Sequence, residues 1–282
     1  MNIGLIGLPR SGKTTVFNAL TGYEAPTDAY TGSAVEPNVA MVEVADERVA
    51  ELSRLYRPKK TTYATIELVD FAGLAGSEGQ AFSTEALDRI KRCDALAVVV
   101  RNFSDPVVDA EHGPSDPAAD FDTVYGEMLL TDQIVAEKRV ARLVEDRSKG
   151  KPVPAREESV LTRIVDALDA GTPIRDLELD AEASRIASGF QFLTAKPMFV
   201  VLSSDEDTYK RIDLDLPFPV IEFAGAFEAE LSRMEEEEAA EFMHDAGIEE
   251  SARSRLTTFA YRILGYISFF TVGEDEVRAW TI

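Results

Sequence analysis

Residues 7–14, Gly-Leu-Pro-Arg-Ser-Gly-Lys-Thr, have the types and spacing of a phosphate-binding loop. The pattern is a glycine, four residues, a second glycine, then a lysine and a serine or threonine. Residues 3–6 before it are typical of a short buried strand, and residues 15–20 after it are typical of the first turns of a helix. In that order the loop turns backbone N–H groups toward an anion, and the helix adds its positive dipole end. A chance glycine turn is the alternative, but it would not require the lysine–threonine pair or the flanking elements.

Each residue type in this loop suits the binding of a phosphate chain. Gly7 and Gly12 permit a tight turn and a close approach of the backbone to phosphate. Lys13 would reach the β- and γ-phosphates and is the first candidate catalytic residue, and the Thr14 hydroxyl would bind Mg²⁺. The nucleotide-binding residues predicted in this loop are Pro9, Arg10, Ser11, Gly12, Lys13, Thr14 and Thr15.

A second candidate segment, Asp-Phe-Ala-Gly at residues 70–73, ends a predicted strand over residues 65–70. An aspartate at the end of a strand beside a phosphate loop usually belongs to the magnesium shell, directly or through water. Gly73 can turn its N–H toward a γ-phosphate, which makes it the second candidate catalytic residue. Asp-x-x-Gly alone is a weak signal, but the strand before it and the phosphate loop upstream strengthen it. We therefore expect Thr14 and Asp70 to hold Mg²⁺.

Composition and charge narrow the class of protein. The chain has 282 residues, a net charge of −22 and a sequence pI near 4.5. This acidity argues against broad, nonspecific binding to nucleic acid, but it leaves open a local basic patch or a salt-rich habitat. The sequence has one cysteine, Cys93, and its start has no leader pattern. No apolar run approaches the ~20 residues that cross a bilayer, and together these features favour the cytoplasm. Neither His112 nor His244 has metal-ligand spacing to Cys93, so we expect no zinc site.

Hydrophobic patterns along the chain predict an α/β fold. The expected strands are residues 39–44, 65–70, 95–100, 196–202 and 220–223, and the expected helices are residues 46–57, 85–92, 180–192, 228–243 and 251–264. Residues 105–117, rich in proline and glycine, are expected to form a loop, and residues 267–282 a strand, a turn and a strand. The fold class is therefore a P-loop NTPase of the GTPase-like kind, with a mostly parallel sheet and helices on both faces.

Two further helices are predicted in the middle of the chain, over residues 120–148 and 157–170. Each has a narrow apolar stripe and strongly charged flanks, and a short break separates them. This pattern favours an antiparallel helical hairpin that is inserted into the α/β domain as an arm. The alternative is a pair of ordinary surface helices packed on the sheet.

Several segments together make the chain resemble the YchF (Obg-like ATPase) family, which is related to the translation-factor P-loop GTPases. These segments are residues 7–15, 36–38, 69–74, 193–197, 228–231 and 269–282. The resemblance covers essentially the whole chain, and it implies a nucleotide-binding domain, an inserted coiled-coil arm and a C-terminal TGS domain. The boundaries it implies are residues 1–119 and 193–266 for the nucleotide-binding domain, 120–192 for the arm and 267–282 for the incomplete opening of the TGS domain. That ending indicates a shortened chain or a natural short form.

The resemblance also implies a preference for ATP over GTP and an association with the ribosome. The base-reading segment of the family is Asn-x-x-Glu, and residues 203–206 match it here, so that Ser203 replaces the amide while Glu206 remains. The Ser-Ala-Lys segment that supports the base corresponds to residues 224–226, and it begins with Ala224. A serine is too short to replace the amide fully, which leaves the choice between ATP and GTP open.

The switch region departs from the family as well. The threonine that would complete the magnesium shell corresponds to Ala34, and Ser33 or Thr31 could substitute for it. Leu74 stands where Ras-type enzymes have a glutamine that orients water, and the family shares this apolar residue. Hydrolysis is therefore expected to be slow unless a partner or a monovalent ion supplies positive charge.

Three hypotheses of function follow. The first is a Mg²⁺-dependent hydrolase of ATP or GTP that acts as a conformational switch for a large translation-related partner such as the ribosome. The second is a relative that prefers GTP. The third is a scaffold that binds nucleotide without significant hydrolysis, and Ala34 motivates it.

Overall fold

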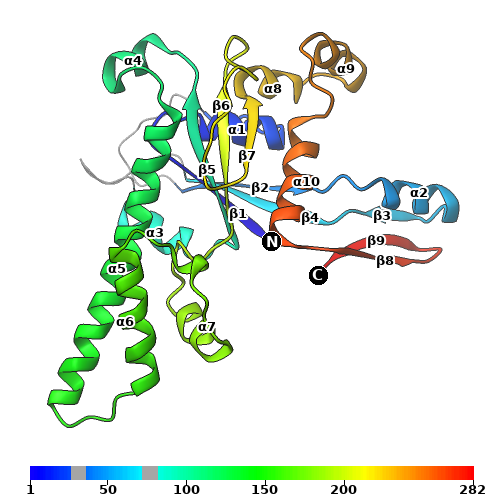
Figure 1. Cartoon of the computed structure of the whole chain (residues 1–282). Coiled ribbons are helices and arrows are strands. Elements are labelled where there is room, and N and C mark those ends of the chain that lie inside the picture. Colours follow the sequence, from blue (N-terminus) through cyan, green and yellow to red (C-terminus); the bar gives the residue numbers. More distant parts are fainter. Residues whose placement is uncertain (27–35, 72–81) are drawn as a thin grey trace.

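A six-stranded sheet forms the centre of the computed structural model, which describes residues 1–26, 36–71 and 82–282 (Figure 1). The strand order is β2-β4-β1-β5-β6-β7, and every neighbouring pair is parallel except β2 with β4. The strands are β1 Asn2–Ile6, β2 Asn38–Glu43, β4 Thr65–Asp70, β5 Ala95–Asn102, β6 Met198–Ser204 and β7 Val220–Ala224. The predicted mostly parallel sheet is confirmed.

Helices cover both faces of this sheet because its central strands are apolar on both sides. Along β5, Ala95, Ala97 and Val99 belong to the core on one face, and the alternate residues from Leu96 to Val100 belong to the core on the other. The helices on the first face are α1 Lys13–Thr21, α8 Gly225–Leu231 and α10 Ala252–Leu264. The second face is covered by α3 Thr84–Ile90 and the first turns of α5 Pro117–Ser148. The expected α/β class, with helices on both faces of the sheet, is therefore confirmed.

The predicted helical arm is also present (Figure 1). Helix α5 runs without a break from the sheet into the arm, where α6 Ala155–Asp169 packs against it. The two helices share a separate apolar core, and Arg139 on α5 donates two hydrogen bonds to the Glu157 carboxylate on α6, at 2.7 and 3.0 Å. Because α6 packs on α5 and not on the sheet, the alternative of two surface helices is wrong.

A buried aspartate joins the arm to the sheet. Asp132 on α5 is fully buried, and its carboxylate accepts hydrogen bonds from the backbone N–H groups of Leu193 and Thr194, both at 2.8 Å, and from the Thr194 hydroxyl at 2.7 Å. Burial raises the pKa of Asp132, and these three donors oppose that rise. The segment that returns from the arm, with η1 Ile174–Asp176 and α7 Ala181–Ser188, is thereby fixed just before β6.

A second, three-stranded sheet forms between segments far apart in the sequence. Its order is β3-β9-β8, with β3 Lys60–Thr62, β8 Ser268–Val272 and β9 Glu276–Thr281. The predicted strand–turn–strand at the end of the chain is confirmed, whereas β3 was not expected. Helix α2 Glu47–Tyr56 packs against this sheet, and the fully buried Val277 of β9 belongs to the same core as Val49 of α2. The assignment of this hairpin to a TGS domain stays a prediction.

Three local predictions differ from the structure. The expected loop over residues 105–117 contains α4 Pro106–His112, which begins at the Asp105 cap with a proline in its first turn, where a proline is tolerated. The single helix expected over residues 228–243 is two helices, α8 and α9 Glu236–Asp245. Between them the Ser232 hydroxyl donates to the Ala229 carbonyl at 2.8 Å, an interaction that competes with helix continuation. The helix expected over residues 180–192 ends at Ser188, one residue before Gly189.

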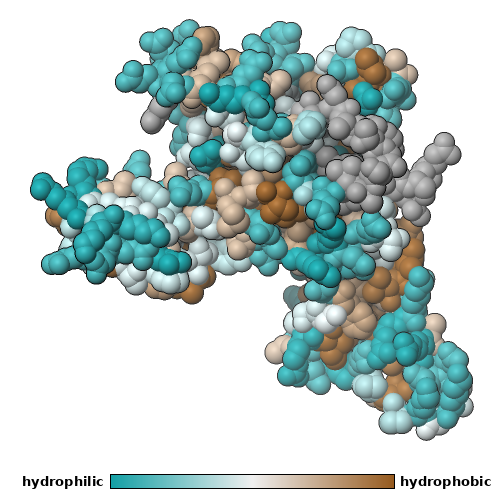
Figure 2. All heavy atoms as spheres, turned by 180° about the vertical axis from the view of Figure 1, so that it is seen from behind, coloured by the Kyte–Doolittle hydropathy of each residue, from teal (hydrophilic) through white to brown (hydrophobic). Residues whose placement is uncertain are grey.

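The surface of the arm is mixed. Figure 2, a view from behind, shows apolar residues interspersed among hydrophilic ones over this part of the molecule. Three large apolar side chains on α5 are exposed, namely Leu130, Ile134 and Val144. In the described ranges, no helix combines the length and apolarity needed to span a bilayer.

Candidate functional site

The predicted phosphate loop lies at the carboxyl edge of the parallel strands, between the end of β1 at Ile6 and the start of α1 at Lys13. A Cβ added at Gly7 would lie 2.3 Å from the Val99 carbonyl oxygen, so only glycine fits there. Gly12 has φ +93°, and a Cβ added to it would lie 2.6 Å from the Ser203 hydroxyl oxygen. Ligands of open α/β sheets usually bind at this edge.

The Lys13 side chain folds back over this loop. Its ammonium donates hydrogen bonds to the Gly7 carbonyl at 3.1 Å and to the Leu8 carbonyl at 2.7 Å, and the residue is only 7% exposed. Burial lowers the pKa of Lys13 from 10.5 to about 8, although the nearby Asp70 carboxylate raises it. The loop therefore encloses a cation whose charge an incoming anion would stabilise.

The Ser11 hydroxyl is the second polar group inside the loop. Ser11 is 1% exposed, and within the described part of the chain its Oγ has no hydrogen-bond partner. A buried hydroxyl without a partner is costly, and a bound ligand is one way to satisfy it. Ser11 is therefore a candidate side-chain contact for phosphate as well as a backbone one.

Thr14 and Asp70 are brought together as expected. The Thr14 hydroxyl donates to Asp70 Oδ2 at 2.8 Å, and Asp70 is fully buried at the end of β4. A hydroxyl and a carboxylate oxygen are the hard ligands that Mg²⁺ prefers, and it usually completes its shell with water and substrate phosphates. Within residues 1–26, 36–71 and 82–282 no group of three or more His, Cys, Asp and Glu side chains could hold a metal by itself.

Asn38 is a residue of the candidate site to which the sequence assigned no role. Its side-chain amide donates to the same Asp70 Oδ2 at 3.1 Å, because the antiparallel register of β2 and β4 places Asn38 directly opposite Asp70. The amide therefore orients the carboxylate that faces Thr14. The signal in the sequence was the segment at residues 36–38, which contributed to the family resemblance without a defined contact.

The base end of the predicted site is built around Ser203. This residue is 2% exposed at the end of β6. Its hydroxyl oxygen lies so close to two glycines that a Cβ added at Gly12 would be 2.6 Å from it, and a Cβ added at Gly225 would be 3.1 Å from it. Ser203 therefore bridges the phosphate loop and the turn that follows Ala224. Glu206, in contrast, is exposed in the turn after Asp205 and is not packed into this cluster.

A buried ion pair supports the turn between β7 and α8. Glu228 accepts a hydrogen bond from the Ala224 backbone N–H at 2.9 Å, and its other oxygen pairs with the Arg255 guanidinium. Arg255 also donates to the Glu222 carbonyl at 2.8 Å and lies over the Phe223 ring. Burial raises the pKa of Glu228, although the Arg255 partner lowers it. Sequence reasoning missed this pair, because its members lie 27 residues apart on different helices.

Gly73, the second candidate catalytic residue, lies outside the described residues, and so do Leu74, Ala34, Ser33 and Thr31.

Cys93 is buried, and burial raises the pKa of its thiol to about 11. It is therefore protonated at neutral pH and unsuited to nucleophilic chemistry.

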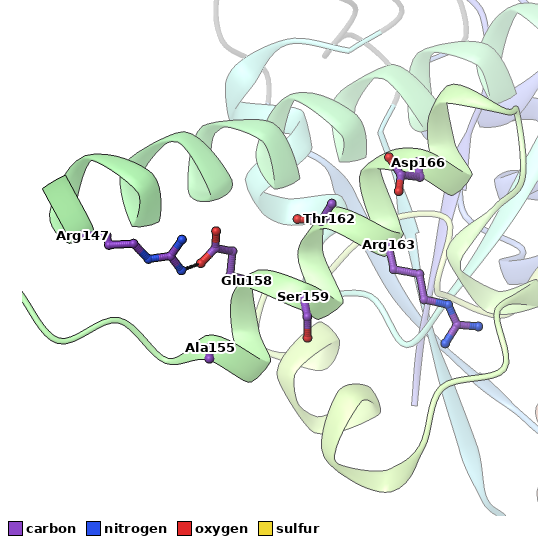
Figure 3. A pocket seen from close by; sticks show the side chains of 7 residues that line it. All are labelled: Arg147, Ala155, Glu158, Ser159, Thr162, Arg163 and Asp166. Carbon is purple, nitrogen blue, oxygen red and sulfur yellow. Dashed lines mark hydrogen bonds and ion pairs between the residues drawn. The ribbon is translucent and has the colours of Figure 1, made fainter.

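A hollow on the arm lies far from this site in the fold. It is lined by Arg147 of α5 and by residues of α6, and Arg147 forms an ion pair with Glu158 across it (Figure 3). Because Arg147 and Glu158 already pair with each other, we assign no chemistry to the hollow.

Comparisons with known proteins agree with this architecture. The profile of a family described as 50S ribosome-binding GTPase matches residues 2–135. The ribosome-binding ATPase YchF of Bacillus subtilis is 32% identical over 295 residues, an alignment that covers 100% of this chain and 81% of that protein. The protein of the same name from Pasteurella multocida is 34% identical over 291 residues, an alignment that covers 99% of this chain and 80% of that protein.

A solved structure of a relative has the same fold as this chain. The Schizosaccharomyces pombe YchF GTPase matches with a TM-score of 0.82 at 28% sequence identity, and the match covers 100% of this chain and 80% of that one. Identity above 30% along the whole chain, with a phosphate loop at the carboxyl edge of a matching sheet, shows that the chain belongs to the YchF family of P-loop NTPases.

Proposed function

We propose that the protein hydrolyses ATP or GTP slowly, in a Mg²⁺-dependent reaction, and acts as a conformational switch. The observation that carries the proposal is the arrangement of Lys13, Thr14 and Asp70. The buried ammonium of Lys13 lies over the loop. On the next residue, the Thr14 hydroxyl is hydrogen-bonded to the Asp70 carboxylate. This arrangement matches what a triphosphate with its metal requires.

In this proposal a triphosphate replaces the Gly7 and Leu8 carbonyls as the partner of the Lys13 ammonium. Backbone N–H groups from Arg10 to Thr15 and the Ser11 hydroxyl bind the phosphate oxygens. Thr14 and Asp70 would hold Mg²⁺, which when bound neutralises the charge that develops on the phosphates.

Two further residues complete the proposed site. Asn38 keeps the Asp70 carboxylate oriented through its hydrogen bond. Gly73 is proposed to sense the γ-phosphate through its N–H.

The base lies against the end of β6 and the turn after β7, where Ser203 and Ala224 are close to the loop and Glu206 follows. ATP is favoured because the Bacillus and Pasteurella relatives are named ATPases. GTP preference is the second candidate, since the matching Schizosaccharomyces structure is named a GTPase. Competition between ATP and GTP for the same fluorescent nucleotide separates the two.

We also propose a cytoplasmic role on the ribosome or another large translation-related partner. The relatives are named ribosome-binding, and the arm of α5 and α6 is joined rigidly to the nucleotide domain through Asp132. In this view residues 1–119 and 193–266 bind nucleotide, residues 120–192 report its state, and residues 267–282 open a TGS-like unit.

A single-turnover assay with Mg²⁺ and K⁺ tests the hydrolysis. Wild-type protein is expected to release phosphate from bound ATP or GTP, and Lys13→Ala is expected to abolish the release. The control is Lys138→Ala, a change at an exposed lysine on α5. Binding of triphosphate without any release by the wild type would leave the nucleotide-binding scaffold as the function, and no binding of ATP or GTP in calorimetry would overturn the whole proposal.

A further inference from the structure

Arg10 is an unusual residue for its place in the phosphate loop. Its backbone has φ +59°, a left-handed conformation that residues other than glycine rarely adopt. Glycine would fit this position most easily, yet the chain carries a long cationic side chain there. The side chain begins in the loop that binds phosphate in the proposed function.

In this structure the Arg10 guanidinium is held by a carboxylate on another element. Its Nε lies 3.6 Å from Glu111 Oε2, and the two side chains are 47% and 52% exposed. An ion pair that is half in water and this long is weak, so another anion can displace it. A phosphate group carries more charge than a carboxylate and matches the planar fork of a guanidinium.

Glu111 belongs to a helix whose position is fixed. The buried Arg101 of β5 donates to the Asp109 carboxylate in α4 and to the carbonyl of Gly113, the residue just after α4, both at 2.6 Å. These two contacts lie on either side of Glu111. Because α4 is tied to the sheet, Glu111 stays in place when ligand arrives. The flexible Arg10 side chain is then the part that moves.

The proposed reaction needs positive charge at the γ-phosphate. Water attacks the γ-phosphorus, the bond from that phosphorus to the bridging oxygen breaks, and its electron pair stays on the diphosphate. The proton of the water passes to the released phosphate. An arginine that stabilises the charge of this transition state, in cis or in trans, is worth about 10³ to 10⁵ in rate.

We propose that Arg10 is a catalytic residue: its guanidinium leaves Glu111 when a triphosphate binds and lies against the γ-phosphate oxygens. The protein thus carries in its own loop the cation that an activating partner or a monovalent ion would otherwise supply. Glu111 is the partner that the guanidinium exchanges for phosphate. The inference rests on the proposed function, since it assigns a role within that hydrolysis.

The test compares four variants with wild type at saturating ATP or GTP, whichever binds more tightly. Arg10→Ala and Arg10→Gly remove the guanidinium, and glycine tolerates the positive φ, so a loss shared by both comes from the side chain. Arg10→Lys keeps a charge without the fork. Arg156→Ala is the matched control, because Arg156 is also 47% exposed and paired with carboxylates, but lies on the arm.

We expect Arg10→Ala and Arg10→Gly to lower kcat by about 10²-fold or more, with the affinity for ADP, which has no γ-phosphate, changed by less than about threefold. Arg10→Lys should retain part of the activity, and Arg156→Ala all of it. The transition-state mimic ADP–aluminium fluoride should bind the Arg10 variants more weakly than wild type, although ADP alone does not. A purely structural role would not produce this difference.

A kcat for Arg10→Ala and Arg10→Gly within about twofold of wild type would overturn the role of Arg10. The hydrolase function would still stand in that case, provided that Lys13→Ala abolishes phosphate release. If wild type itself releases no phosphate, the proposed function fails first, and the role of Arg10 fails with it.

Discussion

The buried ammonium of Lys13 gives nucleotide binding a pH dependence. In the free protein the pKa of Lys13 is lowered to about 8, so the amine is charged below that pH and neutral above it. Bound phosphates stabilise the ammonium and raise its pKa again, so that binding above pH 8 must take up a proton. Below pH 8 the amine is already charged and no uptake is needed.

We therefore expect the Kd for ADP to be flat up to about pH 8 and then to rise by up to about tenfold per pH unit, as proton linkage requires. Titrations with a fluorescent nucleotide between pH 7 and 9.5 measure this rise. Calorimetry in buffers of different ionisation enthalpy measures the proton uptake. In the Lys13→Ala control the rise should disappear. A wild-type Kd that is constant across this range would show that Lys13 does not titrate on binding.

Single residues were predictable where a motif fixes their spacing. Lys13, Thr14 and Asp70 were predicted as site residues because a phosphate loop and a strand-end aspartate have local patterns, and the structure places the three side chains together. Asn38 was not given its role, because its contact depends on the register of two antiparallel strands. Glu228 was missed for a similar reason, since its Arg255 partner comes from another helix.

At the scale of elements, α5 is the connection between nucleotide site and arm. It is one helix of 32 residues, and its apolar side chains pack first on the sheet, through Phe121 and Met128, and then on α6, through Leu143. An unbroken helix moves as a rigid rod, so a shift at the sheet is carried to the tip of the arm. Gly126 is an exposed residue in the stretch of α5 that packs on the sheet, and it lowers the stability of the helix.

Gly126→Ala should stabilise the protein by about 0.5–1 kcal/mol, because alanine loses less backbone entropy in a helix and a Cβ at Gly126 would meet nothing within 4 Å. Gly150→Ala is the matched control. A Cβ at Gly150 also meets nothing within 4 Å, but its φ is +74°, so alanine there should destabilise by about 1 kcal/mol. Urea denaturation measures both changes. Equal effects of the two substitutions would contradict this reasoning.

Elements with a clear period were predictable, and those decided by capping or distant pairing were not. The pattern over residues 120–148 identified α5, but α4 was missed because Pro106 at its start and Gly113 after its end are typical of a loop. The break between α8 and α9 was missed because the acidic run continues a helical pattern. β3 is three residues long and exists only because β9 pairs with it, 216 residues later at Lys60↔Glu276.

At the scale of the whole molecule, the end of the chain is packed onto its first third. β9 pairs with β3, the Thr62 hydroxyl donates to the Glu276 carboxylate at 2.5 Å, and the Arg48 guanidinium lies over the Phe270 ring. Val277 is 0% exposed within the core that also contains Val49 and reaches α1 and the main sheet. The terminal hairpin is therefore expected to unfold together with the nucleotide-binding domain and not before it.

Val277→Ala tests this coupling, because it removes two buried methyl groups and should lower the free energy of unfolding by about 2 kcal/mol. Val272→Ala in the same hairpin is the control, since Val272 is 39% exposed and its truncation should change stability by less than about 0.5 kcal/mol. Urea denaturation followed by the single tryptophan, Trp280 in β9, and by far-ultraviolet circular dichroism should give coincident transitions in both variants. If Val277→Ala shifts only the tryptophan transition, the hairpin unfolds alone, and residues 267–282 behave as a separate unit, as the TGS prediction implies. If both transitions shift together, nucleotide binding at the loop should also protect the amides of β9 from hydrogen exchange, because the two then share one unfolding reaction.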